Sequence, residues 1–545
     1  MTDQRILASS AVMAAGTVVS RLSGYVRSML LVAALGVLLH GDLFSIANTL
    51  PNMVYILVAG GVFNAVLVPQ LVRAMKEDPD GGDAYASRVI TLSALFLAAV
   101  TLVLVVAAPA LLRLYLHPGY FEPARAAHLE SMVDLTRWCL PQVFFYGMFV
   151  LVGQVLNARG RFGPMMWAPI ANNLIAVVML TAYLVLYGKA TGAGKYAAYA
   201  PDQEVLLGLG STLGIVAQLL ILVPYLKAAG FHYRPRFDFR DPGLARTLRL
   251  GLWTVLFVVV NQVAYLVVVW LASGGTVHGG EGTGYTVYSS AFLLVMVPHS
   301  IVTVSLATAI LPRISDQAHD GRLADLGHTL ASTLRTCLVL VLPFAALLPV
   351  VAPDVANAMF GWGAGRDDVH LIVPSLAIFG PALVFFTVHY LMLRGFYALE
   401  LTRRVFVIQC AIAATNVVVA VTLVSRAPAE HTSPALALAY LAAYAVGSLL
   451  SYGALRRLVG GLDTPVLVRF LVRMVVAVGL ATLAAWAVTR GLAGLGDQPH
   501  PVVSAVRGGL AGTAALVVLV ALARALRIRE VTVLLDTLVG RLRRS

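Results

Sequence analysis

The most informative shortage in this sequence is that of charged residues. The 545 residues include 39 Lys and Arg and 26 Asp and Glu, so only 12% are charged, about half the roughly 25% found in soluble domains. Hydrophobic residues make up 59% of the chain, and its mean hydropathy is +0.85. A chain so poor in charge cannot cover its own surface with polar groups. Water-soluble enzymes and disordered proteins are therefore excluded.

Cysteine is also scarce. The three cysteines, Cys139, Cys337 and Cys410, are far apart and fall within apolar stretches. Disulfide scaffolds and zinc sites both need several cysteines at short spacings. We therefore expect no disulfide framework, no metal centre and no cofactor.

What the sequence has in abundance is apolar stretches of about 20 residues, the length that crosses about 30 Å of hydrocarbon. They predict an all-α polytopic membrane protein. The first stretch carries arginines and is longer than the apolar part of a signal peptide, so we expect it to remain as the first helix. The fourteen expected transmembrane spans are 6–36, 43–72, 89–116, 135–157, 164–187, 206–229, 246–272, 285–311, 327–353, 369–398, 404–426, 433–457, 466–492 and 503–527.

The distribution of basic residues predicts the orientation. If the N-terminus is cytoplasmic, about two thirds of the 39 Lys and Arg residues fall in the inner segments, as the positive-inside rule requires. Both termini are then cytoplasmic. The net charge of +13 follows from these loop arginines, so nucleic acid is not an expected partner.

The second and eighth spans share a layout about 245 residues apart. Pro51 opens one and Pro298 the other, and each closes on a second proline, Pro69 or Pro312. The offset of six helices predicts two parallel lobes that can rock about a site at the membrane midplane.

The fourth and tenth spans end alike, with Gly153–Arg159 matching Leu393–Ala398, which supports the same repeat. The last two helices lie outside it. The expected organisation is a six-helix lobe at 1–230, a basic cytoplasmic linker at 231–245, a second six-helix lobe at 246–458, and two extra helices with a basic cytoplasmic tail at 459–545.

Two arginines, Arg21 and Arg27, lie inside the first span, with Gly24 between them. An arginine at membrane depth costs at least about 2.5 kcal/mol unless it faces water or an anion. No acidic residue inside a span is placed to neutralise the pair, and Asp42, at the outer boundary, is the nearest candidate to pair with Arg27. Guanidinium binds phosphate and carboxylate oxygens bidentately, so the two side chains are expected to converge on an anionic cargo.

These features resemble the MurJ/MviN lipid II flippases, a family of the multidrug/oligosaccharidyl-lipid/polysaccharide exporter superfamily. The resemblance covers the whole chain, including the two extra helices, which drug exporters of the superfamily lack. The Ala-, Val- and Arg-rich composition suggests an actinobacterial source. The segments that carry the resemblance are Ser20–Arg27, Gly41–Phe44, Leu50–Asn52, Phe63–Pro69, Leu156–Phe162, Arg234–Asp238 and Ala309–Arg313.

The resemblance implies a transporter and not an enzyme. The implied activity is the movement of the undecaprenyl-pyrophosphate-linked peptidoglycan precursor across the bacterial cytoplasmic membrane by alternating access, alongside proteins of cell-wall synthesis. The two extra helices correspond to a groove that holds the lipid tail. The implied headgroup ligands are Arg21 and Arg27, and the implied cavity or gate residues are Ser20, Gly24, Asp42 and Asn52.

The sequence departs from well-studied members of that family. Further arginines expected in the second and eighth spans are replaced by Tyr55 and Leu293, and an expected glutamate by Gly60. The acidic groups of a family sodium site are absent from the seventh and eleventh spans, which carry Asn261 and Asn416 instead. The cargo site is therefore expected to be less cationic than in those members.

Three alternatives remain open at this stage. The chain could carry another lipid-linked oligosaccharide, although the extra pair of helices argues against a twelve-helix exporter. It could be a membrane glycosyltransferase, which needs a positioned base. The acidic loop 77–80 could supply one, although a Pro- and Gly-rich loop is a poor scaffold for catalysis. It could also be a scaffold that recruits cell-wall proteins through its basic tail.

Overall fold

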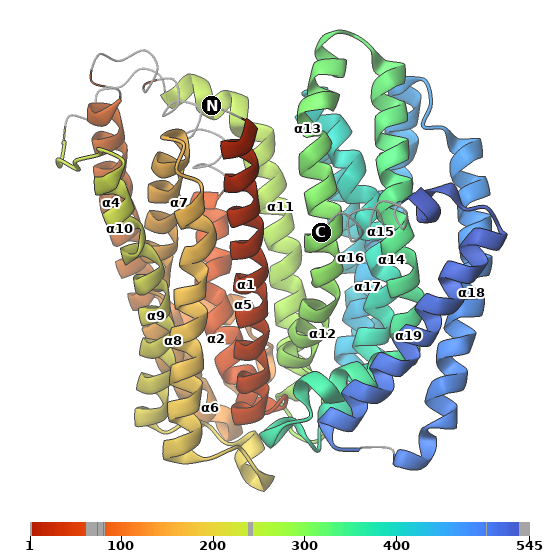
Figure 1. Cartoon of the computed structure of the whole chain (residues 1–545). Coiled ribbons are helices and arrows are strands. Elements are labelled where there is room, and N and C mark those ends of the chain that lie inside the picture. The colour runs from red at the N-terminus through yellow and green to blue at the C-terminus, as the bar shows by residue number, and fades with distance from the viewer. Residues whose placement is uncertain are drawn as a thin grey trace. The chain divides into compact units, whose positions relative to one another are not determined.

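The computed structural model (Figure 1) describes residues 3–60, 74, 80, 82–237, 244–496 and 499–533, and describes side chains in these ranges except at 3–15, 59, 60, 244–251 and 495. These residues form helices and no strand, which confirms the expected all-α fold. The Phe63–Pro69 segment, the second half of the second expected span, residues 238–243 of the linker and the tail from residue 534 lie outside the described residues.

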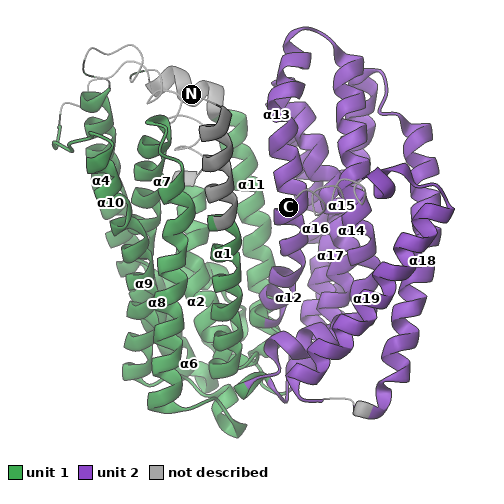
Figure 2. Cartoon of the chain, viewed as in Figure 1, with its two compact units in different colours: residues 1–280, 284–286, 363–365 green, residues 281–283, 287–362, 366–545 purple. Residues whose placement is uncertain are grey.

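Two compact units divide the chain (Figure 2). Unit 1 consists of residues 1–280, 284–286 and 363–365, and unit 2 of residues 281–283, 287–362 and 366–545. The helices of unit 1 are α1 (Asp3–Leu35), α2 (Leu39–Tyr55), the π-helix η1 (Ile56–Gly60), α4 (Asp83–Val106), α5 (Ala108–Tyr115), α6 (Ala126–Cys139), α7 (Gln142–Ala158), α8 (Gly163–Tyr187), α9 (Pro201–Leu220), α10 (Leu222–Ala228) and α11 (Leu244–Thr276).

Unit 2 holds the remaining helices, apart from the first two residues of α12, which belong to unit 1. Short 3₁₀ turns connect helices in both units, at 118–121, 123–125, 192–196, 363–365, 369–372, 429–431 and 493–495. The helices of unit 2 are α12 (Tyr285–Pro298), the π-helix η6 (His299–Thr303), α13 (Val304–His319), α14 (Leu323–Phe360), α15 (Val373–Ala398), α16 (Thr402–Val424), α17 (Thr432–Val459), α18 (Thr464–Gly491) and α19 (Pro501–Ala525).

Thirteen helical segments among the described residues are long and apolar enough to cross a membrane. Each matches one of the fourteen expected spans. The remaining expected span, 43–72, is described only as far as Gly60, through α2 and η1. The expected orientation of the termini stays a prediction.

The side chains that point away from the helix packing are apolar. On α8, Leu174, Val178 and Val185 are 61–78% exposed, and on α18, Val472 and Val475 are each 61% exposed. In water such surfaces would lead to association, whereas hydrocarbon solvates them. The chain is therefore a multi-pass membrane protein.

The seventh span differs from its expected place in the second lobe. Helix α11 contacts α2, η1 and α5, so it belongs to unit 1 and the compact unit continues to Gly280 instead of ending at the linker. The linker itself begins on α4, where the backbone N–H of Arg236 donates to Thr91 Oγ1 at 3.2 Å. Sequence periodicity finds a helix but does not show which bundle its faces contact.

The two spans related by the predicted repeat share a feature that the sequence does not reveal. In each, the helix that carries the opening proline, Pro51 or Pro298, passes into five residues of π-helix, η1 or η6. A π-helical segment is rare and often marks a functional site. The π-helical segment begins five residues after Pro51 and one residue after Pro298, so both spans are interrupted near the proline but not at the same aligned position.

Candidate functional site

The two arginines of the first span lie on one unbroken helix, α1. Counted back from the end of α1 at Leu35 with a rise of about 1.5 Å per residue, Arg27 lies about 12 Å and Arg21 about 21 Å from that helix end. Arg27 therefore lies two turns inside the end of the helix. A half-buried guanidinium at this depth needs a polar or anionic neighbour.

Arg27 faces the interior of unit 1. It is half-buried and acts electrostatically on Cys139, at the end of α6, and on Tyr146 of α7. Within the described part of the chain, no carboxylate forms an ion pair with it. The described residues thus leave its charge without a carboxylate partner.

One face of α2 lies against the same part of α7. Gln142 Nε2 donates to Asn48 Oδ1 at 3.1 Å, and the rings of Tyr55 and Tyr146 stack with centroids 5.8 Å apart. Residues at i, i+4 and i+7 share a helix face, so Asn52 lies between Asn48 and Tyr55. Asn52 is half-buried, and no hydrogen bond of its side chain is found among the described residues. Its amide therefore adds polar capacity to the face of α2 that packs on α7.

Arg21 has different surroundings. Its side chain is exposed, and its electrostatic neighbour is Tyr25, one turn further along α1. Among the described residues, the electrostatic neighbour of Arg21 is Tyr25 and those of Arg27 are Cys139 and Tyr146, so the expected convergence of the two arginines on one cargo stays a prediction. Arg27 is the arginine that points into unit 1.

Ser20 and Gly24 pack against α8. The side-chain amide of Asn173 donates to the Ser20 carbonyl at 3.0 Å and to Ser23 Oγ at 2.9 Å. A Cβ on Gly24 would lie 3.6 Å from Asn173 Nδ2, an ordinary van der Waals distance, so Gly24 faces Asn173 and the space there would accept a methyl group. The structure thus places these two residues, expected at a cavity or gate, in a helix–helix contact.

Asp42 does not pair with Arg27, so that expectation is wrong. Its carboxylate is fully buried and accepts hydrogen bonds from Thr276 Oγ1 at 2.7 Å and from the backbone N–H groups of Tyr285 at 3.2 Å and Thr286 at 2.7 Å. The two N–H groups open α12 and have no partner within their own helix. A carboxylate satisfies such groups and interacts favourably with the helix dipole, so Asp42 holds α2, α11 and the start of α12 together.

The glycine before α12 provides a test of this role. A Cβ on Gly284 would overlap Asp42 Oδ2, so Gly284→Ala is expected to displace the carboxylate from its three donors. The expected loss of stability is about 2 kcal/mol, seen as a lower melting temperature of the purified protein. Gly453→Ala is the control, because a Cβ there meets nothing within 4 Å. Equal melting temperatures for Gly284→Ala and Gly453→Ala would contradict the capping role of Asp42.

Helices α18 and α19 pack along α14 in unit 2, and buried polar contacts fasten one end of this packing. Arg507 Nε donates to Asp354 Oδ1 at 2.7 Å, with side chains 10% and 3% exposed. Next to this pair, Asn357 Nδ2 donates to Ser504 Oγ at 2.8 Å and to the Pro499 carbonyl at 2.9 Å. The start of α19 is therefore tied to the end of α14.

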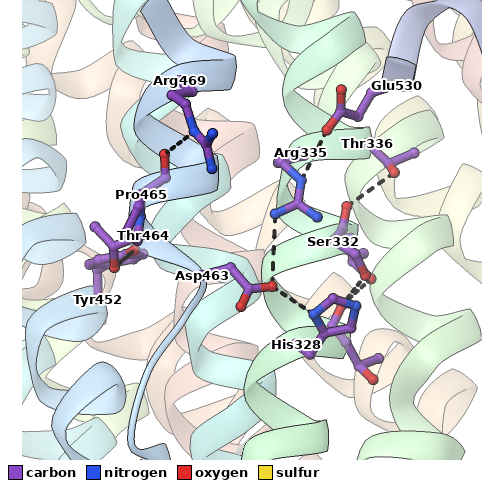
Figure 3. Close-up of polar contacts among 12 residues, drawn as sticks. His328, Ser332, Arg335, Thr336, Tyr452, Asp463, Thr464, Pro465, Arg469 and Glu530 are labelled. Carbon is purple, nitrogen blue, oxygen red and sulfur yellow. Dashed lines mark hydrogen bonds and ion pairs between the residues drawn. The ribbon is translucent and has the colours of Figure 1, made fainter. Parts of the chain in front are cut away.

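A second polar cluster fastens the other end of the pair (Figure 3). On α14, Arg335 lies 3.1 Å from Glu530, which follows α19, and 4.0 Å from Asp463, which precedes α18. His328, two turns before Arg335, forms a 2.6 Å contact with Asp463. Both ends of the extra pair are thus attached to α14, so the pair and α14 form one packed element of unit 2.

Between these two attachments lies an apolar cavity of about 260 Å³. Only one of its lining side chains, Thr482, has a polar group. Its lining residues are Pro343, Phe344 and Leu347 of α14, Val478, Ala481 and Thr482 of α18, and Gly512, Ala515, Leu516 and Leu519 of α19. A space of this kind suits an acyl or prenyl chain.

The sequence reasoning missed one membrane arginine, Arg394, on α15 of unit 2. Its guanidinium donates to the Tyr390 hydroxyl, and its central carbon lies 4.5 Å from the centre of the Tyr390 ring. The signal was present, because Arg394 matches Gln154 in the predicted repeat and therefore falls within a span. Within the residues described, no three His, Cys, Asp or Glu side chains are grouped to hold a metal ion.

Comparison with known families identifies this membrane protein. A family model described as lipid II flippase MurJ matches residues 31–495. The chain belongs to the MurJ family. The probable lipid II flippase MurJ of Rhizobium meliloti (strain 1021) is 26% identical over 485 residues, covering 88% of this chain and 85% of the relative. Its counterpart in Vibrio cholerae is 27% identical over 413 residues, 74% of each chain.

Solved structures show the same fold. A lipid II flippase MurJ in an inward closed conformation superposes with a TM-score of 0.71 and 17% identity, covering 95% of this chain and 99% of that one. An inward-facing multidrug resistance MATE transporter of the MOP superfamily gives a TM-score of 0.63 over 81% of this chain. Family and fold therefore confirm the resemblance read from the sequence, and place this MurJ family member in the bacterial cytoplasmic membrane.

Proposed function

We propose that the chain moves the lipid-linked peptidoglycan precursor, lipid II, from the inner to the outer leaflet. Arg27 is the observation that carries the proposal, since it is a half-buried arginine at membrane depth with no carboxylate partner in the described residues. Such a charge calls for an anionic ligand, and the pyrophosphate of the precursor is one. Membership of the MurJ family supports the same cargo.

The proposed mechanism is alternating access. Arg21, about 21 Å from the outer end of α1, attracts the pyrophosphate from the cytoplasmic side. Arg27 then binds it beside Asn52 and Tyr146, and the site opens to the outside. Moving a pyrophosphate and sugars through bare hydrocarbon would cost tens of kcal/mol, which these polar groups offset. Enzymes that make or consume the precursor are the expected functional partners.

The prenyl tail is proposed to occupy the apolar cavity between α14, α18 and α19. Lipid hydrocarbon already solvates such a tail, so the cavity contributes packing and orientation and no large gain from leaving water. The ion pairs Asp354–Arg507 and Arg335–Asp463 hold the cavity walls together at both ends. The headgroup can then cross while the tail remains in an apolar environment.

Filling this cavity is expected to slow transport. Gly512→Phe adds a ring where a Cβ meets nothing within 4 Å, and we expect the rate of precursor externalisation to fall about tenfold, equivalent to about 1.4 kcal/mol. Gly479→Phe on α18 is the matched control, because Gly479 is exposed and does not line the cavity. Equal rates for both variants would rule out the tail site.

A membrane enzyme acting on the same lipid is the alternative of a different class. Of its candidate acidic loop, residues 77–79 lie outside the described residues. Asp80 accepts hydrogen bonds from the backbone N–H groups of Gly82 at 3.0 Å and Ala84 at 2.8 Å. The bond from Ala84 lowers the pKa of Asp80, so the carboxylate is a poorer base than usual. Its contacts are those of a residue that caps α4.

The proposed function is tested in a strain depleted of its own precursor flippase. Expression of the chain is expected to restore growth and to return unmodified precursor to the outer leaflet, measured by its accessibility to an added external enzyme. Mass spectrometry of the extracted lipid separates transport from catalysis. Restored growth with a chemically altered lipid, or no restoration by well-expressed protein, would contradict the proposal.

A further inference from the structure

Unit 2 contains a membrane arginine, Arg394, whose hydrogen-bonding capacity is only partly used by the described residues. Arg394 lies four residues, about 6 Å, before the end of α15. In the described residues no carboxylate pairs with it, and its Nε is buried without a hydrogen-bond partner. An arginine that merely extends to the membrane interface would place its guanidinium in water, so this one needs another explanation.

A second unsatisfied nitrogen lies in the same cluster. His299, the first residue of η6, is 5% exposed, and its Nδ1 is buried without a hydrogen-bond partner among the residues that the structure describes. Its ring centre lies 4.7 Å from that of Tyr390 and 4.6 Å from that of Phe386, and Arg394 acts on it electrostatically. Buried polar groups are almost always paired, so two orphaned nitrogens in one cluster point to a missing ligand.

The predicted repeat places this cluster at the position equivalent to the site in unit 1. Aligning Pro298 with Pro51 puts His299 opposite Asn52, and the tenth span puts Phe386 opposite Tyr146. In both units the proline-bearing span packs on the matching helix, α2 on α7 and η6 on α15, beside a π-helical segment. The two units thus offer polar groups at equivalent places.

We propose that Arg394 and His299 bind phosphate oxygens of the transported lipid, as a second headgroup position in unit 2. The inference rests on the proposed function. Tyr390 stacks against the guanidinium and orients it, which leaves further N–H groups of Arg394 for bidentate contact with phosphate. The second position supplies positive charge that the chain lacks at Tyr55 and Leu293, where the resemblance leads one to expect arginine.

Binding of two lipid probes tests the proposal. Purified full-length protein in nanodiscs is titrated with undecaprenyl pyrophosphate and with undecaprenol, and occupancy is read by native mass spectrometry. Wild type is expected to prefer the pyrophosphate. Arg394→Gln is expected to reduce that preference about tenfold or more, because it removes a charge-assisted contact. Arg404→Gln removes an exposed arginine of the next helix and is expected to change nothing.

The outcomes separate the two proposals. If wild type does not prefer the pyrophosphate, the proposed function fails. If wild type prefers the pyrophosphate and Arg394→Gln keeps the full preference, the second headgroup position is overturned while the proposed function stands. Should Arg394→Gln fail to fold, Arg394→Lys decides, since lysine keeps the charge but loses the planar fork. A reduced preference in the lysine variant supports the position, and an unchanged one overturns it.

Discussion

Arg27→Gln is expected to lower the rate of precursor externalisation about a hundredfold while the protein remains folded and inserted. Glutamine keeps a polar side chain beside Tyr146 but removes the only charge that α1 directs into unit 1 in the described structure. Hydrogen bonds to charged groups contribute about 1.5–3 kcal/mol, the range that corresponds to such a loss. The rate is measured in the depletion strain, with protein level checked by immunoblot.

Two further variants calibrate this result. The externalisation rate of Arg27→Lys is expected to lie between those of wild type and Arg27→Gln, because an ammonium group keeps the charge without bidentate geometry. Arg457→Gln removes an exposed arginine at the end of α17 and is expected to leave the rate unchanged. If Arg27→Gln transported as well as Arg457→Gln, Arg27 would have no part in binding the headgroup.

Breaking the buried pair between Asp354 and Arg507 is expected to cost about 3–5 kcal/mol of stability. Asp354→Leu leaves the Arg507 guanidinium, 10% exposed, without its carboxylate, and an uncompensated buried charge is strongly destabilising. The double variant Asp354→Leu/Arg507→Met removes both charges and is expected to recover most of the loss. Unfolding free energies from titration with dodecyl sulfate measure the coupling.

An exposed pair provides the comparison. Arg322 and Asp320 form a 2.8 Å ion pair with both side chains 51% exposed, and such surface pairs contribute about 0–1 kcal/mol. Asp320→Leu is therefore expected to change stability little. A large effect there, or additive effects at Asp354 and Arg507, would show that α19 is not held to α14 by this pair.

The spans were predictable because crossing hydrocarbon imposes a length and an apolar composition on each segment. The places where the helices of these spans are interrupted were harder to predict from the sequence. The break at Leu140–Pro141 between α6 and α7 and the π-helical segments at Ile56 and His299 depend on how each helix packs, which hydropathy does not record. The placement of α11 with unit 1 also depends on helix packing and was therefore not predictable from hydropathy.

The candidate site was predictable in residue type but not in contacts. An arginine inside a span is conspicuous by its cost, so Arg27 could be found from the sequence. The partner of Asp42 could not, because it is a helix start more than 240 residues away, and a backbone N–H has no sequence signature. Arg394 is less conspicuous in the sequence because it stands four residues before the end of α15, where arginines usually extend to the interface.

The central claim is that this chain transports a lipid pyrophosphate by means of Arg27. Purified protein in sealed proteoliposomes, loaded with a fluorescent lipid-linked precursor, tests it without other cell components. The fraction of label that an impermeant quencher reaches is expected to rise above that of protein-free liposomes for wild type, and to stay at the protein-free level for Arg27→Gln. Equal accessibility with wild-type protein and without protein, or equal transport by wild type and Arg27→Gln, would contradict the account.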